Sequence, residues 1–239
     1  MQALILAGGL GTRLRAVLSD KPKPMATIGG KPFIEYQIAW LKKHEVTDLV
    51  LCVGYRHEQI RDYFADGERW GIKIRYSVEE ELQGTAGALK LAQRYVTGPF
   101  WVLNGDSYFD IDPGKLAQFH QQMKAERGGL GTLALTDKQD ARDYGAVTLS
   151  AKNEILRFEE KSAPVGAAKT INAGIYILEP EILNAIPAAQ KVSLERETFP
   201  FVLQQGHVLF GYRSSGYFID IGTPQGYLEF QQHIAERHA

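Results

Sequence analysis

The first residues that could do chemistry form a glycine-rich turn after an apolar run, in LILAGGLGTRL (residues 4–14). Backbone N–H groups in such a turn can surround a phosphate chain, and Arg13 can meet its oxygen atoms as a planar fork. Leu14 stands where the dinucleotide fingerprint needs a third glycine, and the Lys-Ser or Lys-Thr ending of an ATPase loop is absent. The turn therefore predicts a phosphate site of another class, with an ordinary strand-to-helix turn as the alternative.

A basic segment, DKPKPMA (20–26), follows this turn. Pro22 and Pro24 stiffen the chain around Lys23 and hold it extended, so the ammonium group is placed in advance. A lysine held in this way suits a phosphate group under attack. An exposed basic turn is the alternative.

Two aspartates stand at the ends of apolar strand-like runs. Asp106 ends WVLNGD, and Asp220 lies in FIDIG. An open α/β sheet forms its ligand crevice at the carboxyl ends of its strands. Two carboxylates, completed by phosphate oxygens and water, suit Mg²⁺. We therefore expect Asp106 and Asp220 to hold Mg²⁺, although a strand-end aspartate taken alone is more often a turn or a helix cap.

Strand-like and helix-like runs alternate through the first half of the chain. Strands are predicted at 2–8, 48–55, 72–80 and 100–106, and helices at 32–44, 58–66, 84–96 and 113–126. This alternation predicts a Rossmann-like α/β fold with a mixed, mostly parallel sheet flanked by helices. After about residue 130 most runs are strand-like. We expect one domain (1–239) with a nucleotide-binding lobe (about 1–130) and a substrate-binding lobe (about 131–239).

The composition is that of an ordinary soluble protein. The 239 residues are 44% hydrophobic and 23% charged with a formal net charge of −1, so no nucleic-acid partner is expected. The single cysteine, Cys52, excludes an internal disulfide and a multi-cysteine metal site. We find no signal peptide and no apolar run long enough to span a bilayer. These observations predict a cytoplasmic protein without a membrane partner.

Taken together, the motifs resemble those of the sugar-1-phosphate nucleotidylyltransferases. LAGGLGTRLR, PKPM, GKPFIEY, QGTAGAL, LNGD, FEEK, NAGIY and DIGTP occur in the order found in that family and cover nearly the whole chain. RLRAVLSDKPKPMA and SLERETFPF most resemble the branch that makes GDP-heptose from D-glycero-D-manno-heptose 1-phosphate. EEELQGTAGAL is also similar to the GDP-mannose enzymes, which are the alternative. Ala16 and Leu18 depart from the family pattern, where proline and threonine are common.

The resemblance implies the nucleotide-diphospho-sugar transferase fold. It also implies a nucleotidyl-transfer reaction. A sugar 1-phosphate attacks the α-phosphorus of a nucleoside triphosphate, and pyrophosphate leaves. Because the nucleophile is already an anion, the protein needs fixed cations and Mg²⁺ rather than a catalytic base. Arg13, Lys23 and Lys161 are the implied catalytic cations, with Lys161 on the sugar phosphate. Relatives commonly form dimers, so the resemblance also allows a homodimer.

The family pattern further implies two sets of binding residues. The nucleotide set is Leu6, Ala7, Gly8, Gly9, Gly11, Thr12, Arg13, Glu79, Glu80, Gly84, Thr85 and Asp106. The sugar-phosphate set is Gly145, Glu159, Lys161, Asn172, Gly174, Glu195 and Arg196.

The stretch VEEELQG bears on the choice of base, because pyrimidine-using relatives generally place a glutamine near its start. Here Glu79 and Glu80 occupy that region. Guanine offers N1–H and its exocyclic amine as adjacent donors, which one carboxylate can accept together, whereas uracil presents one donor between two acceptors. We therefore favour GTP as the substrate, with Glu79 or Glu80 contacting the base. A solvated run of charges is the alternative.

The sequence disfavours two other classes of protein. A nicotinamide oxidoreductase would need the third glycine and a ribose-binding acid on the second strand, and both are absent. A non-catalytic sensor of nucleotide sugars would be expected to have lost some of Arg13, Lys23, Asp106 and Asp220, and all four are present. A nucleotidyl transferase is therefore the favoured interpretation.

Overall fold

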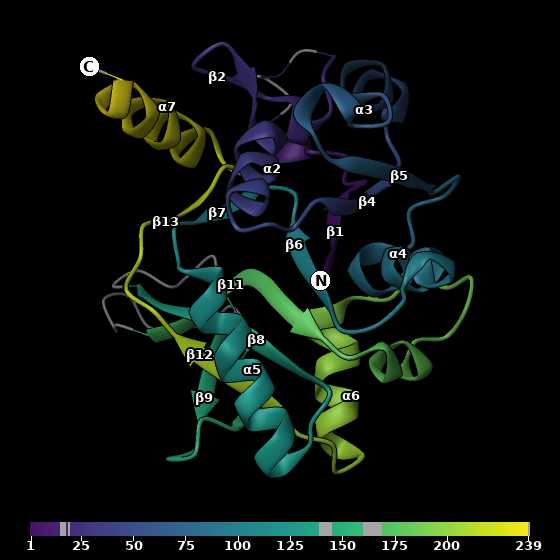
Figure 1. The fold of residues 1–239 in the computed structure, drawn as a ribbon, viewed down its shortest axis with the longest axis vertical. Helices are drawn as coiled ribbons and strands as arrows, with labels where there is room; N and C mark the ends of the chain where they lie inside the picture. Colours follow the sequence, from purple (N-terminus) through teal and green to yellow (C-terminus); the bar gives the residue numbers. More distant parts are fainter. Residues whose placement is uncertain (15–17, 19, 139–144, 160–168, 239) are drawn as a thin grey trace.

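The computed structural model of the protein describes residues 1–14, 18, 20–138, 145–159 and 169–238. The strands are β1 (Gln2–Ala7), β2 (Thr27–Ile28), β3 (Lys31–Pro32), β4 (Asp48–Val53), β5 (Lys73–Val78), β6 (Phe100–Asn104), β7 (Ser107–Phe109), β8 (Gly131–Lys138), β9 (Ala146–Leu149), β10 (Ile155–Glu159), β11 (Lys169–Leu178), β12 (Leu209–Arg213) and β13 (Phe218–Asp220). The central sheet runs β10-β9-β11-β6-β1-β4-β5, with β8 paired to β11 and β12 paired to β8 (Figure 1).

Helices lie on both faces of this sheet (Figure 1). The α-helices are α2 (Phe33–Lys43), α3 (His57–Phe64), α4 (Gly84–Leu91), α5 (Pro113–Arg127), α6 (Phe199–Gln204) and α7 (Pro224–His238). Short helical turns are η1 (Thr12–Leu14), η2 (Lys23–Met25), η3 (Glu68–Trp70), η4 (Ala92–Tyr95), η5 (Pro180–Ala185) and the π-turn η6 (Leu194–Thr198).

Successive residues of β1 point to opposite faces of the sheet, as in any strand. Ala3 and Ile5 join the core that α2, α3 and α5 cover, and Leu4 joins the core under α4 and α6. A strand covered on both faces needs apolar residues throughout, which explains the continuous apolar run ALILA. Cys52 is fully buried in the second of these cores, where it packs as a small apolar residue.

The sheet combines parallel and antiparallel pairs. β1 pairs in parallel with β4 and β6, and β4 with β5, as the strand–helix alternation predicts. In the second half, β11 runs antiparallel to β6 and β8, β10 runs antiparallel to β9, and β12 is parallel to β8. The predicted fold class, a mixed sheet flanked by helices in one domain, is therefore confirmed.

The elements agree with the expected ranges in the first half, with one refinement. The helix predicted at 84–96 is α4 followed by the 3₁₀ turn η4. The sequence analysis did not predict α7, which lies at the C-terminal end of the chain (Figure 1). Its Phe230 and Ile234 pack in a third core with Leu14, Ile28 and Ile221. This core holds the basic N-terminal segment beside β13 and Asp220.

Leu18, at a position where the family commonly has threonine, is buried in this third core. Its apolar side chain therefore has a packing role there. Ala16 lies outside the described residues. Among the residues that the structure describes, no helix has the length and apolar character that a bilayer-spanning segment requires.

Candidate active site

A cavity of about 280 Å³ opens where β1 and β6 end, at their carboxyl ends. Its wall is formed by the glycine turn after β1, the start of η2, the segment from Glu79 to Ala88, the turn after β6, and Lys191. The cavity thus lies where parallel α/β sheets form their ligand sites. Its volume is near the lower end of the range for small-molecule sites.

The glycine turn lies against Lys23 at one end of the site. Gly11 has a left-handed backbone (φ +60°), and a Cβ atom there would be 3.1 Å from the Cβ atom of Lys23. A Cβ atom on Gly222 would be 3.2 Å from Lys23 Nζ and 3.4 Å from Arg13 Nη2. Two of the three predicted cations, Arg13 and Lys23, therefore converge beside Gly222, next to Asp220.

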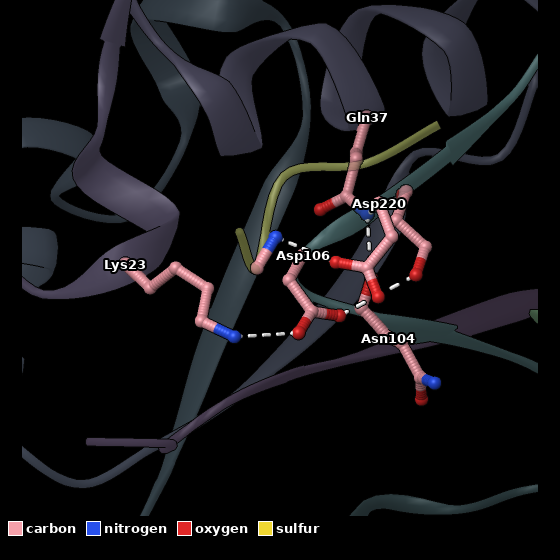
Figure 2. Close-up of polar contacts among 7 residues, drawn as sticks. Lys23, Gln37, Asn104, Asp106 and Asp220 are labelled. Atoms are coloured by element: carbon pink, nitrogen blue, oxygen red, sulfur yellow. Dashed lines mark hydrogen bonds and ion pairs between the residues drawn. The ribbon is translucent and has the colours of Figure 1, made fainter. Parts of the chain in front are cut away.

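The two predicted acids are brought together by a strand pair, because Asp220 in β13 is opposite Ser107 in β7, the residue that follows Asp106. Lys23 Nζ donates to Asp106 Oδ2 at 2.7 Å, and the Gly222 N–H donates to Asp220 Oδ1 at 2.5 Å (Figure 2). Burial, and next the charge of Asp106, raise the pKa of Asp220 to about 6, against the opposing effects of the Gly222 N–H and the nearby cations. The site therefore holds two carboxylates and two cations within one small region.

Gln37, on α2, fixes the turn that carries Asp106. Its side chain is buried, and Nε2 donates to the Asn104 carbonyl at 2.8 Å and to the Ser107 carbonyl at 2.7 Å (Figure 2). Within the turn, the Gly105 N–H donates to the Leu6 carbonyl at 3.0 Å. The turn is thereby bonded on one side to α2 and on the other to β1. Its geometry depends on both.

At the other end of the cavity, Glu79 presents a buried carboxylate. Its Oε2 accepts the Gln83 N–H at 2.8 Å, and burial raises the pKa of Glu79 although this N–H acts to lower it. A Cβ atom on Gly8 would overlap Glu79 Oε1, so any other residue at position 8 would displace this carboxylate. Glu80 is exposed and does not line the cavity. Of the two candidates for contacting the base, only Glu79 is in place.

Three residues of the predicted sugar set come together at the start of β11. The Asn172 N–H donates to the Gly145 carbonyl at 3.2 Å, and Asn172 Oδ1 accepts the Gly174 N–H at 2.9 Å. Gly174 has a left-handed backbone (φ +72°), and a Cβ atom there would be 2.8 Å from Asn104 Nδ2. A register shift between Asn172 and Tyr176 in the β8–β11 pairing accompanies this turn of the strand.

A buried network connects this sugar-side group to the cavity. The Tyr176 hydroxyl accepts from Asn172 Nδ2 at 2.9 Å and donates to Glu195 Oε1 at 3.0 Å. Glu195 Oε2 accepts from the hydroxyls of Thr85 and Ser193, each at 3.0 Å. Burial and then Glu195 raise the pKa of Tyr176 well above its usual value, so the hydroxyl stays protonated. Both carboxylate oxygens of Glu195 are therefore engaged within the protein.

Comparison with known proteins identifies the family. The model of the family described as nucleotidyl transferase matches residues 2–237, nearly the whole chain. The chain belongs to the nucleotidyl transferase family.

Relatives of this nucleotidyl transferase include a D-glycero-alpha-D-manno-heptose 1-phosphate guanylyltransferase of Campylobacter jejuni, 40% identical over 96% of this chain and 98% of the relative. A mannose-1-phosphate guanyltransferase of Kluyveromyces lactis is also 40% identical, over 95% of this chain and 63% of the relative. Among solved structures, HddC from Yersinia pseudotuberculosis complexed with GMP-PN has a TM-score of 0.83 and 30% identity, covering 98% of this chain and 99% of HddC.

The nucleotidyl transferase site collects most of the nucleotide set predicted from the sequence. The members that line the cavity are Leu6, Ala7, Gly8, Gly9, Glu79, Gly84, Thr85 and Asp106, joined by Lys23. Gly11, Thr12, Arg13, Glu80 and Asp220 do not line it. Arg13 and Asp220 lie beside the Lys23–Asp106 pair, as described above. The metal-ligand and nucleotide roles of all these residues stay predictions.

Some sugar-side assignments cannot be placed. Lys161 lies outside the described residues, as does the side chain of Glu159. Arg196 is exposed on η6, and its N–H donates to Ser193 Oγ at 3.2 Å. The sugar-contact roles of all three residues, like those of Gly145, Asn172, Gly174 and Glu195, stay predictions.

Sequence reasoning missed several residues that the nucleotidyl transferase fold places in or behind the cavity. These are Pro24, Leu82, Ala88, Asn104, Gly105 and Lys191 in the wall, and Gln37 behind it. Asn104 and Gly105 could have been found, because they precede Asp106 at the same strand end. Gln37 carried no signal, since its position in an amphipathic helix does not show which carbonyl groups it meets.

Replacing Gln37 with methionine tests the support of the Asp106 turn. The change removes both hydrogen bonds while keeping a side chain of similar length. We expect a loss of unfolding free energy of about 1–3 kcal/mol, measured in urea, and a several-fold higher Mg²⁺ concentration for half-maximal turnover. Gln59→Met, which removes one exposed hydrogen bond to the Asp20 carbonyl, is the control. An unchanged Mg²⁺ dependence in Gln37→Met would contradict the positioning role.

Replacing Tyr176 with phenylalanine tests the buried network. Loss of the hydroxyl leaves Asn172 Nδ2 and Glu195 Oε1 each without this partner, which should cost about 1–3 kcal/mol of unfolding free energy. We also expect a higher KM for the sugar 1-phosphate, because Asn172 loses the bond that orients it. Tyr212→Phe is the control, because its hydroxyl makes no hydrogen bond with the described residues. Equal effects of the two changes would exclude a specific role for the network.

Proposed function

We propose that this chain transfers GMP from GTP to D-glycero-D-manno-heptose 1-phosphate, which yields GDP-heptose and pyrophosphate. One observation carries the proposal. A single cavity has the buried Glu79 carboxylate at one end and the Lys23–Asp106 pair at the other. The first suits the donor edge of guanine, and the second suits phosphate groups. The Campylobacter jejuni relative supports heptose 1-phosphate as the acceptor.

The reaction needs one bond formed and one bond broken. An oxygen of the sugar phosphate forms a bond to the α-phosphorus of GTP, and the bond from that phosphorus to the bridging oxygen of the β-phosphate breaks. No proton has to be removed from the nucleophile, because it is an anion at neutral pH. The chain must instead bring two anions together, and Arg13 and Lys23 supply positive charge beside the acids.

The side chains around Asp220 fit a divalent metal. Asp220, in β13, lies opposite Ser107, the residue after Asp106, and the charge of Asp106 disfavours the charged form of Asp220. A divalent cation would relieve this repulsion, and its remaining ligands would be phosphate oxygens and water. Among the described residues, no group of three or more His, Cys, Asp or Glu side chains could hold a metal ion by itself. A metal bound to the two aspartates would therefore take its other ligands from the substrate and from water. We propose that Asp106 and Asp220 hold Mg²⁺, which would offset charge on the transferring phosphate.

The proposed reaction is tested by pyrophosphate release across a grid of substrates with Mg²⁺. GTP, ATP, UTP, CTP and dTTP are each combined with heptose, mannose and glucose 1-phosphates. The highest kcat/KM is expected for GTP with D-glycero-D-manno-heptose 1-phosphate. A maximum for GTP with mannose 1-phosphate would replace the acceptor and favour the second candidate, which the Kluyveromyces lactis relative supports. No release with any pair would favour a nucleotide-sugar sensor.

We also propose a location in the cytoplasm and a homodimer. A cytoplasmic location is supported by the single cysteine, which is free and buried, since disulfides are rare in reducing compartments. The dimer rests on the family resemblance alone. Light scattering at micromolar concentration tests it, with one protomer mass as the contradicting result.

A further inference from the structure

The residues from Gln190 to Ser193 lie along the loop that leads from Glu79 into α4. The Val192 N–H donates to the Gln83 carbonyl at 2.8 Å, and the Val192 carbonyl accepts the N–H groups of Ala86 at 3.0 Å and Gly87 at 3.4 Å. These three bonds join two segments that are far apart in the sequence. We call residues 190–193 the strap.

Two glycines allow the strap to lie this close. A Cβ atom on Gly84 would be 2.5 Å from the Val192 carbonyl oxygen, and one on Gly87 would be 2.6 Å from the Gln190 carbonyl oxygen. Both distances are too short for any side chain. The backbone of the strap is therefore fixed against the start of α4. The position of its one charged residue, Lys191, is fixed with it.

Lys191 lines the cavity at the same end as Glu79, Leu82 and Gly84. The other lysine of the cavity wall, Lys23, lies at the opposite end and is paired with Asp106. Lys191 is exposed, and it forms no hydrogen bond or ion pair with the described residues. The base end of the cavity thus has one buried carboxylate and one cation without a protein partner.

We propose that Lys191 contributes to base selection by donating a hydrogen bond to O6 of guanine. This inference rests on the proposed function, in which Glu79 accepts from N1–H and the exocyclic amine. The same edge of guanine carries the acceptor O6 next to these donors, and an ammonium group is a donor only. Adenine has an amino group where guanine has O6, so Lys191 would meet a donor with a donor. Glu79 and Lys191 together then match guanine and oppose adenine.

The test combines a variant with a changed substrate. Lys191→Met is compared with the wild type, using GTP and 6-thio-GTP, which has sulfur in place of O6 and is a weaker acceptor there. In the wild type we expect 6-thio-GTP to be used less well than GTP. Lys191→Met should lower kcat/KM for GTP about tenfold, the low end for a hydrogen bond to a charged group. The preference for GTP over 6-thio-GTP should then nearly disappear.

Two variants complete the design. Lys191→Arg keeps a donor and should retain most of the preference for GTP over 6-thio-GTP. Lys115→Met removes an exposed lysine of α5, outside the cavity wall, and should behave as the wild type. Thermal unfolding of all three variants shows whether the strap stays in place.

The contradicting results are distinct. Lys191→Met would overturn the inference if it lowered the use of GTP, 6-thio-GTP and ATP by one common factor, because the lysine would then act on the phosphates or on the fold. An unchanged kcat/KM for GTP would also overturn it. A wild-type enzyme that prefers UTP to GTP would instead overturn the proposed function, on which this inference rests. If the wild type preferred GTP but Lys191→Met did not change the preference for GTP over 6-thio-GTP, the inference about Lys191 would be wrong and the proposed function would stand.

Discussion

Asparagine in place of Asp106 or Asp220 should lower kcat/KM for pyrophosphate release by about a thousandfold, the scale of losing a central electrostatic contact in a transition state. Under the proposed function, each change removes a negative charge that would hold Mg²⁺ beside the two phosphate groups. The loss should be in kcat rather than in KM, if these acids act mainly on the transferring phosphate. Steady-state kinetics over a range of Mg²⁺ concentrations measures it.

The stability of Asp220→Asn should change in the opposite direction from its activity. Burial and Asp106 raise the pKa of Asp220 in the folded protein to about 6, so the charged form is disfavoured by folding. In EDTA at pH 8, Asp220→Asn should therefore unfold at a higher urea concentration than the wild type. The difference should shrink as the pH falls through 6, because wild-type Asp220 then takes up a proton, and should vanish below the ordinary pKa of an aspartate.

Asp66→Asn is the matched control for this change. Asp66 is exposed, and its Oδ1 accepts the N–H of the residue two positions later, as Asp220 Oδ1 does. It should change neither activity nor the pH dependence of stability. Near-normal turnover in both Asp106→Asn and Asp220→Asn would refute the metal assignment.

The substitution Glu79→Gln should also have a large effect on activity. Glutamine there should lower kcat/KM for GTP by about tenfold to a hundredfold, because one of two hydrogen bonds to a charged acceptor is lost and an amide donor faces a base donor. Use of UTP should fall less or rise. Lowering the pH should likewise raise the KM for GTP in the wild type, since burial raises the pKa of Glu79 and a protonated carboxyl cannot accept both donors.

Glu80→Gln is the control for Glu79→Gln, because Glu80 is adjacent but exposed and outside the cavity wall. It should leave the order of nucleotide preference unchanged. If Glu80→Gln altered the preference and Glu79→Gln did not, the account of base selection would be wrong. Equal, small effects of both would indicate that backbone groups select the base.

The parallel half of the fold was predictable because its central strands β1, β4 and β6 are buried on both faces. Runs such as ALILA in β1 and LVLCV in β4 contain apolar residues throughout, and the helices between them show one apolar face each. The antiparallel half was predicted only as strands. Its pairing depends on contacts between residues far apart in the sequence, such as β8 with β11, which no local pattern contains.

The site was predictable where one strand end or one glycine turn carries the chemistry. Asp106 and Gly8 are of this kind, and Lys23 was found because two prolines hold it within one short basic segment. Gln37 and Lys191 are not, because each reaches the site from a segment distant in the sequence. Glu195 has a partner set that the sequence did not show, because the fold engages both of its oxygens with hydroxyl groups of the protein. Its contact with the sugar stays a prediction.

The central claim, transfer of GMP to a sugar phosphate, is tested most directly by ³¹P NMR of one reaction. Wild-type protein, GTP, Mg²⁺ and D-glycero-D-manno-heptose 1-phosphate labelled with ¹⁸O in its terminal phosphate oxygens are incubated together. The account predicts a new diphosphate ester whose bridging oxygen carries ¹⁸O, and pyrophosphate without label. Inorganic phosphate as the product, or ¹⁸O in the pyrophosphate, would contradict it.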